Sequence, residues 1–385
     1  MKGRIFLIGV TFIMAFVGIT LVIGMFAKQA KAMASTSPVW QQVNADGFGD
    51  SNSGQIPSLT VFNDFLYAGV HNSLNMIETA QIWRTSDGGN WAKVNDHIAN
   101  GSASLIVFNG YLYSGSWGPS YSGAPDSYVW RSQDGLTWTD VITNGFGDTN
   151  NGIARFAIFS DTLYASTWNH VSGSQIWRTT NGTNWEQFVS SIGNDPNNGG
   201  AISSAEFDGY LYWGIGNWTD GGGIWRTDGI TVTPVITHGF GITENAAVAS
   251  LAVFGNYLYA GVWNSSSIQI WRSSNGTQWS NVISGGIGGA GTGMSNALEV
   301  YDDMLYLVSQ NDTTGLEVWR TSNGVDWEQV GFAGFGDSNN HWSYFDNATT
   351  VFQDKLYIAT NNYVSGGEVW QLSLQKMIYL PLVIK

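Results

Sequence analysis

The sequence predicts an all-β protein, a seven-bladed β-propeller of four-stranded blades, from three observations. The 385 residues include 49 glycines, 19 tryptophans, 16 tyrosines and 19 phenylalanines, whereas only 11% are charged. One pattern of short strands returns seven times at spacings of 46 to 51 residues. No helical periodicity accompanies it. A period of this length, with about four short strands in each unit, is typical of propeller blades.

The repeat is clearest in the second and third strands of each unit. The second strand carries Leu-Tyr, and the third carries a tryptophan that is followed by arginine in six copies and by Gln371 in the last. The tyrosines are Tyr67, Tyr113, Tyr164, Tyr212, Tyr259, Tyr306 and Tyr357, and the tryptophans are Trp83, Trp130, Trp177, Trp225, Trp271, Trp319 and Trp370.

The second unit illustrates the four strands expected in each blade, at residues 103–108, 111–117, 127–131 and 137–142. Its inner strands are almost uniformly apolar, as expected when a blade is packed between two others and both of its faces are buried. The first unit should follow the same plan from residue 59 onward.

The two ends of the repeat complement each other. The last unit supplies only three strands, at 349–352, 355–360 and 368–372, whereas residues 40–43 resemble an isolated fourth strand. Trp40-Gln-Gln-Val43 matches Trp91-Ala-Lys-Val94 in sequence. We therefore expect the N-terminal strand to pair with the last blade, which closes the ring without leaving an exposed edge.

The third and fourth strands are joined by a Ser/Thr-x-Asp/Asn-Gly turn, as in Ser132-Gln-Asp-Gly-Leu-Thr-Trp138. Asp or Asn followed by Gly tolerates the left-handed backbone of a tight hairpin. The turn resembles the Asp-box of the BNR-type propeller repeat, although it is one residue shorter, and the copy from Thr227 to Val232 departs further. The resemblance covers residues 40–372 and implies a sialidase-like propeller fold. It implies little about function, because the Asp-box lies at the outer rim, opposite the face where such families usually act.

The N-terminus has the features of an export signal. Lys2 and Arg4 precede an uncharged apolar run from Ile5 to Phe26, and small-x-small sites follow at 30–32 and 32–34. We expect residues 1–34 to be a signal peptide and the protein to be secreted or held at the cell surface. The apolar run is also long enough to span a bilayer, so an uncleaved anchor is an alternative. The propeller would then occupy 35–376, and the apolar tail 377–385 is either a sorting signal or a packed terminal segment.

The charge balance excludes some partners. The net charge is −14, and removal of the leader leaves 11 basic and 29 acidic residues. Such a surface argues against nucleic acid and against anionic lipid, so membrane contact would come only through an uncleaved leader. Cysteine is absent, which excludes disulfides and thiol chemistry. We expect a monomer whose partner is a glycan or a cell-surface polymer.

Three loops that precede inner strands carry an Asp-x-Asn-x-Gly pattern. Alternating side-chain oxygens before a glycine turn can wrap calcium, which takes six to eight oxygen ligands. The third carboxylate and the closing glutamate of a calcium loop are missing, so Asx-turns are the favoured alternative. No other cofactor is expected. The candidate calcium ligands are Asp50, Asn52, Asp148, Asn150, Asp195 and Asn197.

Aromatic and amide side chains follow the second strands at equivalent positions. A tryptophan ring can stack on a sugar face while an amide binds hydroxyl groups, so these pairs suit carbohydrate recognition. The alternative is that the tryptophan caps the core and the asparagine makes a turn. The candidate ligand-binding residues are Trp117, Trp168, Asn169, Asn217, Trp218, Trp263 and Asn264.

Three charged residues interrupt the inner strands. Arg155 replaces a small residue in the repeat, and Glu206 and Glu299 replace apolar or small ones. Each must be paired, solvated or functional. Arg155 and Glu206 fall in neighbouring blades, which favours an ion pair. If the protein is an enzyme, these three residues are its candidate catalytic groups.

The six arginines that follow the repeat tryptophans occupy equivalent positions in separate blades. They therefore cannot converge on one ligand as the arginines of a sialidase do, and we expect them to form structural pairs or to stack on tryptophan.

The regularity of the repeat favours a secreted, non-catalytic binding propeller that recognises carbohydrate through the loops of one face. A glycoside hydrolase or lyase acting on polysaccharide is the alternative from another class, because two convergent carboxylates would suffice. A cell-envelope scaffold without a small ligand is a third.

Overall fold

The computed structural model describes residues 37–74, 77–99, 102–116, 128–264, 266–287, 292–341 and 348–375. The expected leader at 1–34, Trp117 and the tail 377–385 lie outside them. The chain divides into two units, of which Trp40–Leu372 is the body considered below and the other consists of the two chain ends. Within the described ranges, no helix has the length and apolar character of a membrane span.

The described residues are almost entirely β structure, with 28 strands and one short helix, α2 (His238–Gly241). Most strands fall in chain order into groups of four antiparallel neighbours, and the last group takes its fourth strand, β1, from the N-terminal end. The first three groups are β2 (Gln55–Phe62), β3 (Phe65–Leu74), β4 (Ile77–Thr85) and β5 (Ala92–Ala99); β6 (Ser102–Phe108), β7 (Tyr111–Ser116), β8 (Val129–Ser132) and β9 (Thr139–Ile142); and β10 (Gly152–Phe159), β11 (Thr162–Trp168), β12 (Ile176–Thr179) and β13 (Glu186–Val189). The next three are β14 (Gly200–Phe207), β15 (Tyr210–Gly216), β16 (Gly223–Thr227) and β17 (Val232–Ile236); β18 (Asn245–Phe254), β19 (Tyr257–Asn264), β20 (Gln269–Ser273) and β21 (Ser280–Ser284); and β22 (Thr292–Tyr301), β23 (Met304–Asn311), β24 (Glu317–Thr321) and β25 (Glu328–Gln329). The last comprises β26 (Thr349–Phe352), β27 (Lys355–Ala359), β28 (Val369–Gln375) and β1 (Ser37–Gln42), with β1 next to β28.

The predicted strands of the second unit agree with β6 to β9 to within one or two residues. The largest differences are at the starts of β8 and β9. β8 begins at Val129, where backbone pairing with Gly115 of β7 begins, and β9 begins at Thr139, which pairs with Arg131. Pairing between strands, rather than the apolar pattern of one strand, therefore sets these boundaries.

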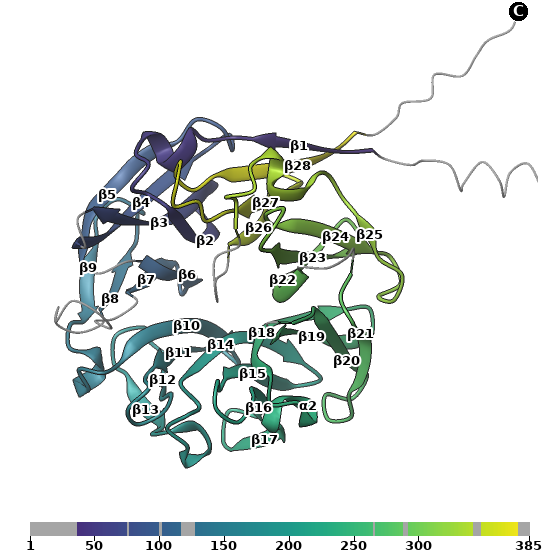
Figure 1. The fold of residues 1–385 in the computed structure, drawn as a ribbon. Helices are drawn as coiled ribbons and strands as arrows, with labels where there is room; N and C mark the ends of the chain where they lie inside the picture. Colours follow the sequence, from purple (N-terminus) through teal and green to yellow (C-terminus); the bar gives the residue numbers. More distant parts are fainter. Residues whose placement is uncertain are drawn as a thin grey trace, which may run out of the picture. The chain divides into compact units, whose positions relative to one another are not determined.

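Successive groups follow one another along the colour scale of Figure 1, and their first strands are in contact. β2 contacts β6, β6 contacts β10, β10 contacts β14, β14 contacts β18, β18 contacts β22, β22 contacts β26, and β26 contacts β2. The hydrophobic clusters lie between groups rather than within them. One cluster joins Phe62 and Tyr67 of the first group to Leu105, Leu112 and Trp130 of the second. Both faces of a group are therefore buried, which explains the uniformly apolar inner strands.

Five of the repeated tyrosines connect their group to the turn of the next. The hydroxyl of Tyr67 lies against Gly135, so closely that a Cβ at residue 135 would collide with it, and Gly135 also has a φ of +72°. The glycine of the turn is thus required twice, for its backbone conformation and for the space it leaves. The same contact joins Tyr113 to Gly182, Tyr212 to Gly276, Tyr259 to Gly324, and Tyr357 to Gly88.

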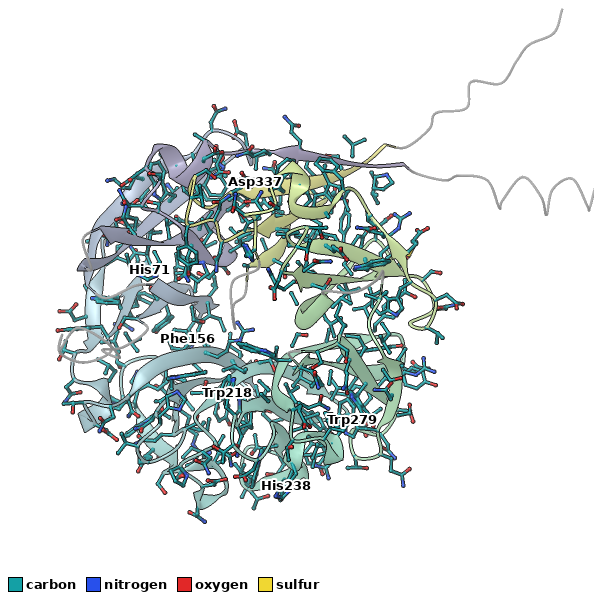
Figure 2. The ribbon with its side chains drawn as sticks, viewed as in Figure 1. His71, Phe156, Trp218, His238, Trp279 and Asp337 are labelled. Atoms are coloured by element: carbon teal, nitrogen blue, oxygen red, sulfur yellow. The ribbon has the colours of Figure 1, made fainter. Side chains whose placement is uncertain are left out.

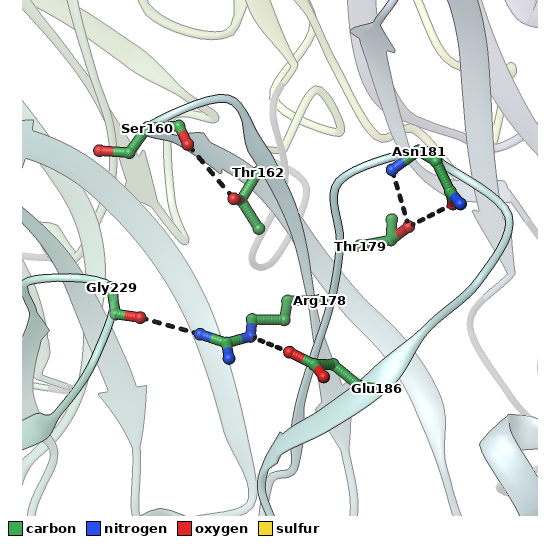
Figure 3. A network of polar contacts seen from close by, with 7 residues as sticks. All are labelled: Ser160, Thr162, Arg178, Thr179, Asn181, Glu186 and Gly229. Carbon is green, nitrogen blue, oxygen red and sulfur yellow. Dashed lines mark hydrogen bonds and ion pairs between the residues drawn. The ribbon is translucent and has the colours of Figure 1, made fainter.

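The turn itself is held by its acidic or amide side chain. Asp134 Oδ1 accepts hydrogen bonds from the backbone N–H groups of Leu136 at 2.8 Å and Thr137 at 2.7 Å. These bonds lower the pKa of Asp134 to about 2, and the bond from Thr137 has the largest effect. In Figure 3, Asn181 occupies the corresponding place, and its backbone N–H donates to Thr179 Oγ1 at 3.3 Å.

The repeated arginines form structural contacts in separate places, as predicted, but the rings they stack on are not tryptophans. Neighbouring residues of a strand point to opposite faces, so an arginine cannot reach the tryptophan that precedes it. Arg178 donates to Glu186 Oε1 at 2.6 Å and to the backbone oxygen of Gly229 in the next group at 2.8 Å (Figure 3). The ring partners are Phe65 for Arg84, Tyr111 for Arg131, Phe188 for Arg178, Tyr210 for Arg226 and Tyr257 for Arg272.

The Gly-Phe-Gly loops before the inner strands share one conformation. Their phenylalanines have φ values between 51° and 61°, a left-handed region that is costly for a bulky residue. Each ring stacks on a repeat tryptophan with centroids 4.4 to 4.7 Å apart, and this contact offsets the cost. The loops are η1 (Asp46–Gly49), η2 (Gly145–Gly147), α2 and η4 (Ala333–Gly336), and the pairs are Phe48 with Trp83, Phe146 with Trp177, Phe240 with Trp271, and Phe335 with Trp370.

The tyrosine contact predicts that Gly135→Ala will be unusually destabilising. We expect a loss of about 3 kcal/mol in the free energy of unfolding, from left-handed strain plus the collision with Tyr67. Gly110→Ala is the matched control, because Gly110 has a similar φ of +74° but open space at its Cβ position. It should cost only about 1 kcal/mol. Urea unfolding measures both, and equal losses would contradict the role given to Tyr67.

Candidate functional site

Four aromatic side chains form one continuous cluster in the third, fourth and fifth groups. The ring centroids of Trp168 and His170 are 5.0 Å apart, those of Trp168 and Trp218 are 5.4 Å apart, and those of Trp218 and Trp263 are 5.8 Å apart. Trp218 is 41% exposed and Trp168 and Trp263 are partly buried. We call this cluster, Trp168, His170, Trp218 and Trp263, the aromatic surface.

The ends of the second strands position the aromatic surface at the junctions between groups. Trp168 ends β11 and pairs through its backbone with Gly200 of β14, and Trp263 in β19 pairs with Met294 of β22. Trp218 follows β15, beside which Figure 2 shows it. Small residues leave room for the rings: a Cβ at Gly200 would collide with Trp168, and one at Gly216 would lie 2.6 Å from Trp218.

The asparagines of the predicted site lie beneath the rings and are bonded to the protein. Asn169 is 1% exposed, and its Nδ2 donates to Asp148 Oδ2 at 3.0 Å and to Asn151 Oδ1 at 2.8 Å. Its Oδ1 accepts from the backbone N–H groups of Val171 and Ser172, both at 2.9 Å. Both ends of this amide therefore hold the loop that follows β11.

The equivalent residues Asn217 and Asn264 behave in the same way, at 2% and 4% exposure. Asn217 accepts from the backbone N–H groups of Thr219 at 3.0 Å and Asp220 at 2.8 Å. Asn264 donates to Asn245 Oδ1 at 2.8 Å. The structure thus brings the tryptophans together at the surface and places the asparagines in the loops that support them.

His170 belongs to the aromatic surface but was not predicted from the sequence. It follows Asn169 directly, just as Trp218 follows Asn217 and Tyr363 follows Asn362. An aromatic residue after the repeated asparagine is the signal that could have found it.

The Asp/Asn loops proposed for calcium make Asx-turns. Asp50 Oδ1 accepts from the backbone N–H of Asn52 at 3.0 Å and from its Nδ2 at 2.8 Å, while Oδ2 accepts from Asn72 at 2.8 Å. The backbone hydrogen bond from Asn52 is the main reason that the pKa of Asp50 lies below its usual value. Asp148 and Asp195 accept in the same way from the backbone N–H groups of Asn150 and Asn197, both at 2.9 Å. Among the residues that the structure describes, no three His, Cys, Asp or Glu side chains gather as metal ligands would.

The three charged residues of the inner strands occupy different levels of the repeat. The cross-strand register makes Arg155 equivalent to Ser203 and Ala297. Glu206 therefore lies three residues beyond the position of Arg155 in the repeat, and Glu299 lies two residues beyond it. Because side chains alternate along a strand, the two glutamates point to opposite strand faces. Glu206 is exposed, at the position where the other groups carry residues such as Val253, Val300 and Val351.

Glu299 lies mostly buried at the contact between β22 and β26. Its Oε2 accepts a hydrogen bond from Thr349 Oγ1 at 3.0 Å, and burial raises its pKa. A carboxyl group with a raised pKa is a candidate proton donor, but catalysis of glycoside hydrolysis also needs a second carboxylate directed into the same pocket.

The comparisons with known proteins identify the fold and not a family. No protein-family model matches the chain, and no curated protein matches its sequence. Among solved structures, it is similar to a GH74 xyloglucanase from Xanthomonas campestris (TM-score 0.53, 14% identity) and to prolyl endopeptidases (TM-score 0.51, 11% identity). Phage phi92 endosialidase and the polysaccharide lyase Uly1 also match, each with a TM-score of 0.52 and 12% identity. The chain has a propeller-type β fold.

The matches extend over most of this chain but over different shares of the others. The match to the endopeptidase covers 80% of this chain and 47% of that protein, and the match to the xyloglucanase covers 84% of this chain and 54% of that protein. For the endosialidase the two shares are 91% and 70%, and for the lyase they are 87% and 92%. The chain therefore spans about half the length of the first two. Three of these propeller-type structures act on glycans by name, and one on peptides.

The buried Glu299 predicts a pH-dependent loss of stability. Because its pKa is raised in the folded state, the unfolded chain releases this proton at a lower pH than the folded protein does, and the free energy of unfolding falls as pH rises through that interval. Glu299→Gln removes the titration and keeps the partner of Thr349. It should stabilise the protein at pH 8 by more than the roughly 0.5 kcal/mol of a surface substitution, with a smaller gain at pH 4.

Urea unfolding at the two pH values measures this difference. The exposed Glu206→Gln is the control and should change stability little at either pH. An equal effect of Glu299→Gln at pH 4 and pH 8 would contradict a raised pKa of Glu299 in the folded protein.

Proposed function

We propose that the protein binds carbohydrate through the aromatic surface, without catalysing its cleavage. The observation that carries this proposal is the contiguity of Trp168, Trp218 and Trp263, which come from three successive groups and form one continuous cluster of rings with His170. Flat aromatic faces stack on the apolar faces of sugar rings, and Trp and His also offer N–H groups to hydroxyls. A continuous cluster of rings from three groups suits a chain of sugar residues better than a single one.

A polysaccharide partner is supported by the propeller-type proteins that resemble the chain, of which three are glycan-acting enzymes by name. Hydrolysis or lysis by this chain is the second candidate, with Arg155, Glu206 and Glu299 as its groups. The register that puts Glu206 and Glu299 on opposite strand faces favours binding over glycoside hydrolysis, which needs both carboxylates in one pocket.

We propose further that the fold is a seven-bladed ring of Asp-box blades closed by the N-terminal strand. Three contacts support closure. β26 contacts β2, the backbone N–H of Val43 donates to the oxygen of Val369 at 2.9 Å, and Tyr357 of the last group lies against Gly88 in the turn of the first. A ring of this kind would present the loops after the second strands together on one face.

Export remains a proposal that rests on the sequence of residues 1–34. A secreted or surface location suits a protein that meets polysaccharide outside the cell. It also suits the scaffold alternative, in which the propeller has no small ligand.

Binding to a glycan array should depend on the aromatic surface. Trp218→Ala is expected to weaken binding of the best glycan about tenfold, and Trp168→Ala combined with Trp263→Ala should abolish it, because each ring contributes stacking energy of about 1 kcal/mol beyond its buried area. Running the array with calcium and with chelator tests whether the Asp/Asn loops need calcium.

Tyr363→Ala is the matched control, since Tyr363 holds the position of Trp218 in the last group, is 61% exposed and lies outside the aromatic surface. It should leave binding unchanged. Cleavage of the bound glycan would favour the enzymatic alternative, and an array without any binding would favour the scaffold.

A further inference from the structure

The fourth group contains a cavity of about 260 Å³ beside its repeat tryptophan, Trp225. The loop before β14, the loop between β15 and β16, and the segment that follows β17 surround it. His238, at the start of α2, is labelled in Figure 2. The side chains that matter here are Asp195, Asn198, Asn217, Asp220, Trp225 and His238.

The cavity exists because two side chains of the repeat are missing around Trp225. Elsewhere a loop phenylalanine, such as Phe48 before Asp50, stacks on the tryptophan. In the loop η3 (Ile192–Asn194), which precedes Asp195, the equivalent residue is Gly193. Gly193 lines the cavity, and a Cβ there would lie 2.9 Å from Trp225 Cζ2, so a phenylalanine at this position would displace the indole and take up part of the cavity.

The second missing side chain leaves the indole N–H of Trp225 open. In three other groups a glutamine two residues before the tryptophan accepts this hydrogen bond, as Gln175 does from Trp177 at 3.0 Å and Gln269 from Trp271 at 3.2 Å. The equivalent residue here is Gly223. Within the described part of the chain, no hydrogen bond from the Trp225 indole is found, and Trp225 lines the cavity.

Two carboxylates complete the site and keep acceptor capacity. Asp195 Oδ1 accepts from the backbone N–H of Asn197 at 2.9 Å, and its Oδ2 has a long contact of 3.4 Å with Asn217 Nδ2. Asp220 Oδ2 accepts from Asn197 Nδ2 at 3.3 Å. A carboxylate can accept about four hydrogen bonds, so both can take further donors from a ligand.

We propose that this cavity binds a single sugar residue. The ligand must offer an apolar face to the indole, an acceptor to its N–H and donors to Asp195 and Asp220, and hydroxyl groups both accept and donate. An organic ammonium ion such as choline could pair with the carboxylates and the ring, but its charged group offers no acceptor to the N–H and its single hydroxyl is its only one. The volume is below the range of roughly 300–1,000 Å³ for drug-sized ligands, which limits the occupant to about one ring.

The site is separate from the aromatic surface, although the loop of Asn217 and Asp220 also carries Trp218. It would hold a terminal or branching sugar residue of a glycan, independently of any sugar chain that stacks on the aromatic surface. This inference does not require the aromatic surface to bind.

The test is saturation-transfer NMR on the full-length protein with glucose, galactose, mannose and N-acetylglucosamine, and with choline as the ammonium probe. At least one sugar should bind, and Gly193→Phe should weaken that binding at least about tenfold by taking up part of the cavity. The substitution copies the loops in which phenylalanine adopts a positive φ, as Gly193 does at 71°.

Asp220→Asn is the second variant, because it removes a carboxylate acceptor while keeping the side-chain shape and does not depend on whether Gly193→Phe folds. It should also weaken binding of the sugar. Tyr363→Ala is the matched control and should leave it unchanged, because Tyr363 is exposed and does not line the cavity.

Binding of choline without any sugar would overturn the proposal, as would the absence of binding by every probe. Sugar binding that survives both Gly193→Phe and Asp220→Asn, or that is lost in Tyr363→Ala, would place the ligand elsewhere and overturn it as well.

Discussion

Contact between the tyrosine hydroxyl of one group and the turn glycine of the next sets the geometry on which the rest of the body depends. The hydroxyl of Tyr67 leaves no space for a Cβ at Gly135, so this contact fixes the distance between a second strand and the turn of the next group. Hydrophobic residues such as Leu105 and Leu112 fill the space between the two groups. Because these contacts recur in five places, the loops that follow each second strand emerge at repeated positions.

A second layer of repeated contacts holds the loops themselves. In several groups an asparagine at the end of the second strand donates to an Asp or Asn of the preceding loop and accepts backbone N–H groups from its own loop, as Asn169 and Asn362 do. Buried amides that are satisfied in this way are costly to leave unpaired, so they specify the loop conformation rather than meet a ligand. In the proposed function, the ligand contacts are made by the residues beside them, above all the rings of Trp168, His170 and Trp218.

The sequence analysis predicted the strands well and the roles of loop side chains less well. The Leu-Tyr and Trp-Arg patterns define strands because the period of two and the apolar faces are local properties, and the ends of β6 to β9 moved only by one or two residues. The stacking partners of the arginines and the burial of Asn217 depend on neighbours supplied by other strands and loops. Trp168 and Trp263 were predicted because they occupy equivalent positions at the ends of the second strands, which the repeat makes visible in the sequence. Trp117 lies outside the described residues, and the structure leaves its role as a prediction.

Departures from the repeat were visible in the sequence, but their meaning required the structure. Gly193 and Gly223 each look like an ordinary glycine in a glycine-rich chain, and only the stacking of Phe146 on Trp177 and the bond from Trp177 to Gln175 show what both positions normally supply. One such loss would leave a small void or an unpaired N–H, which a protein usually avoids. Two losses around the same indole, next to Asp195 and Asp220, leave a polar cavity with unused hydrogen-bonding groups. A repeat protein can therefore create a binding site by omitting side chains from one copy, while the intact copies on either side keep the backbone in place.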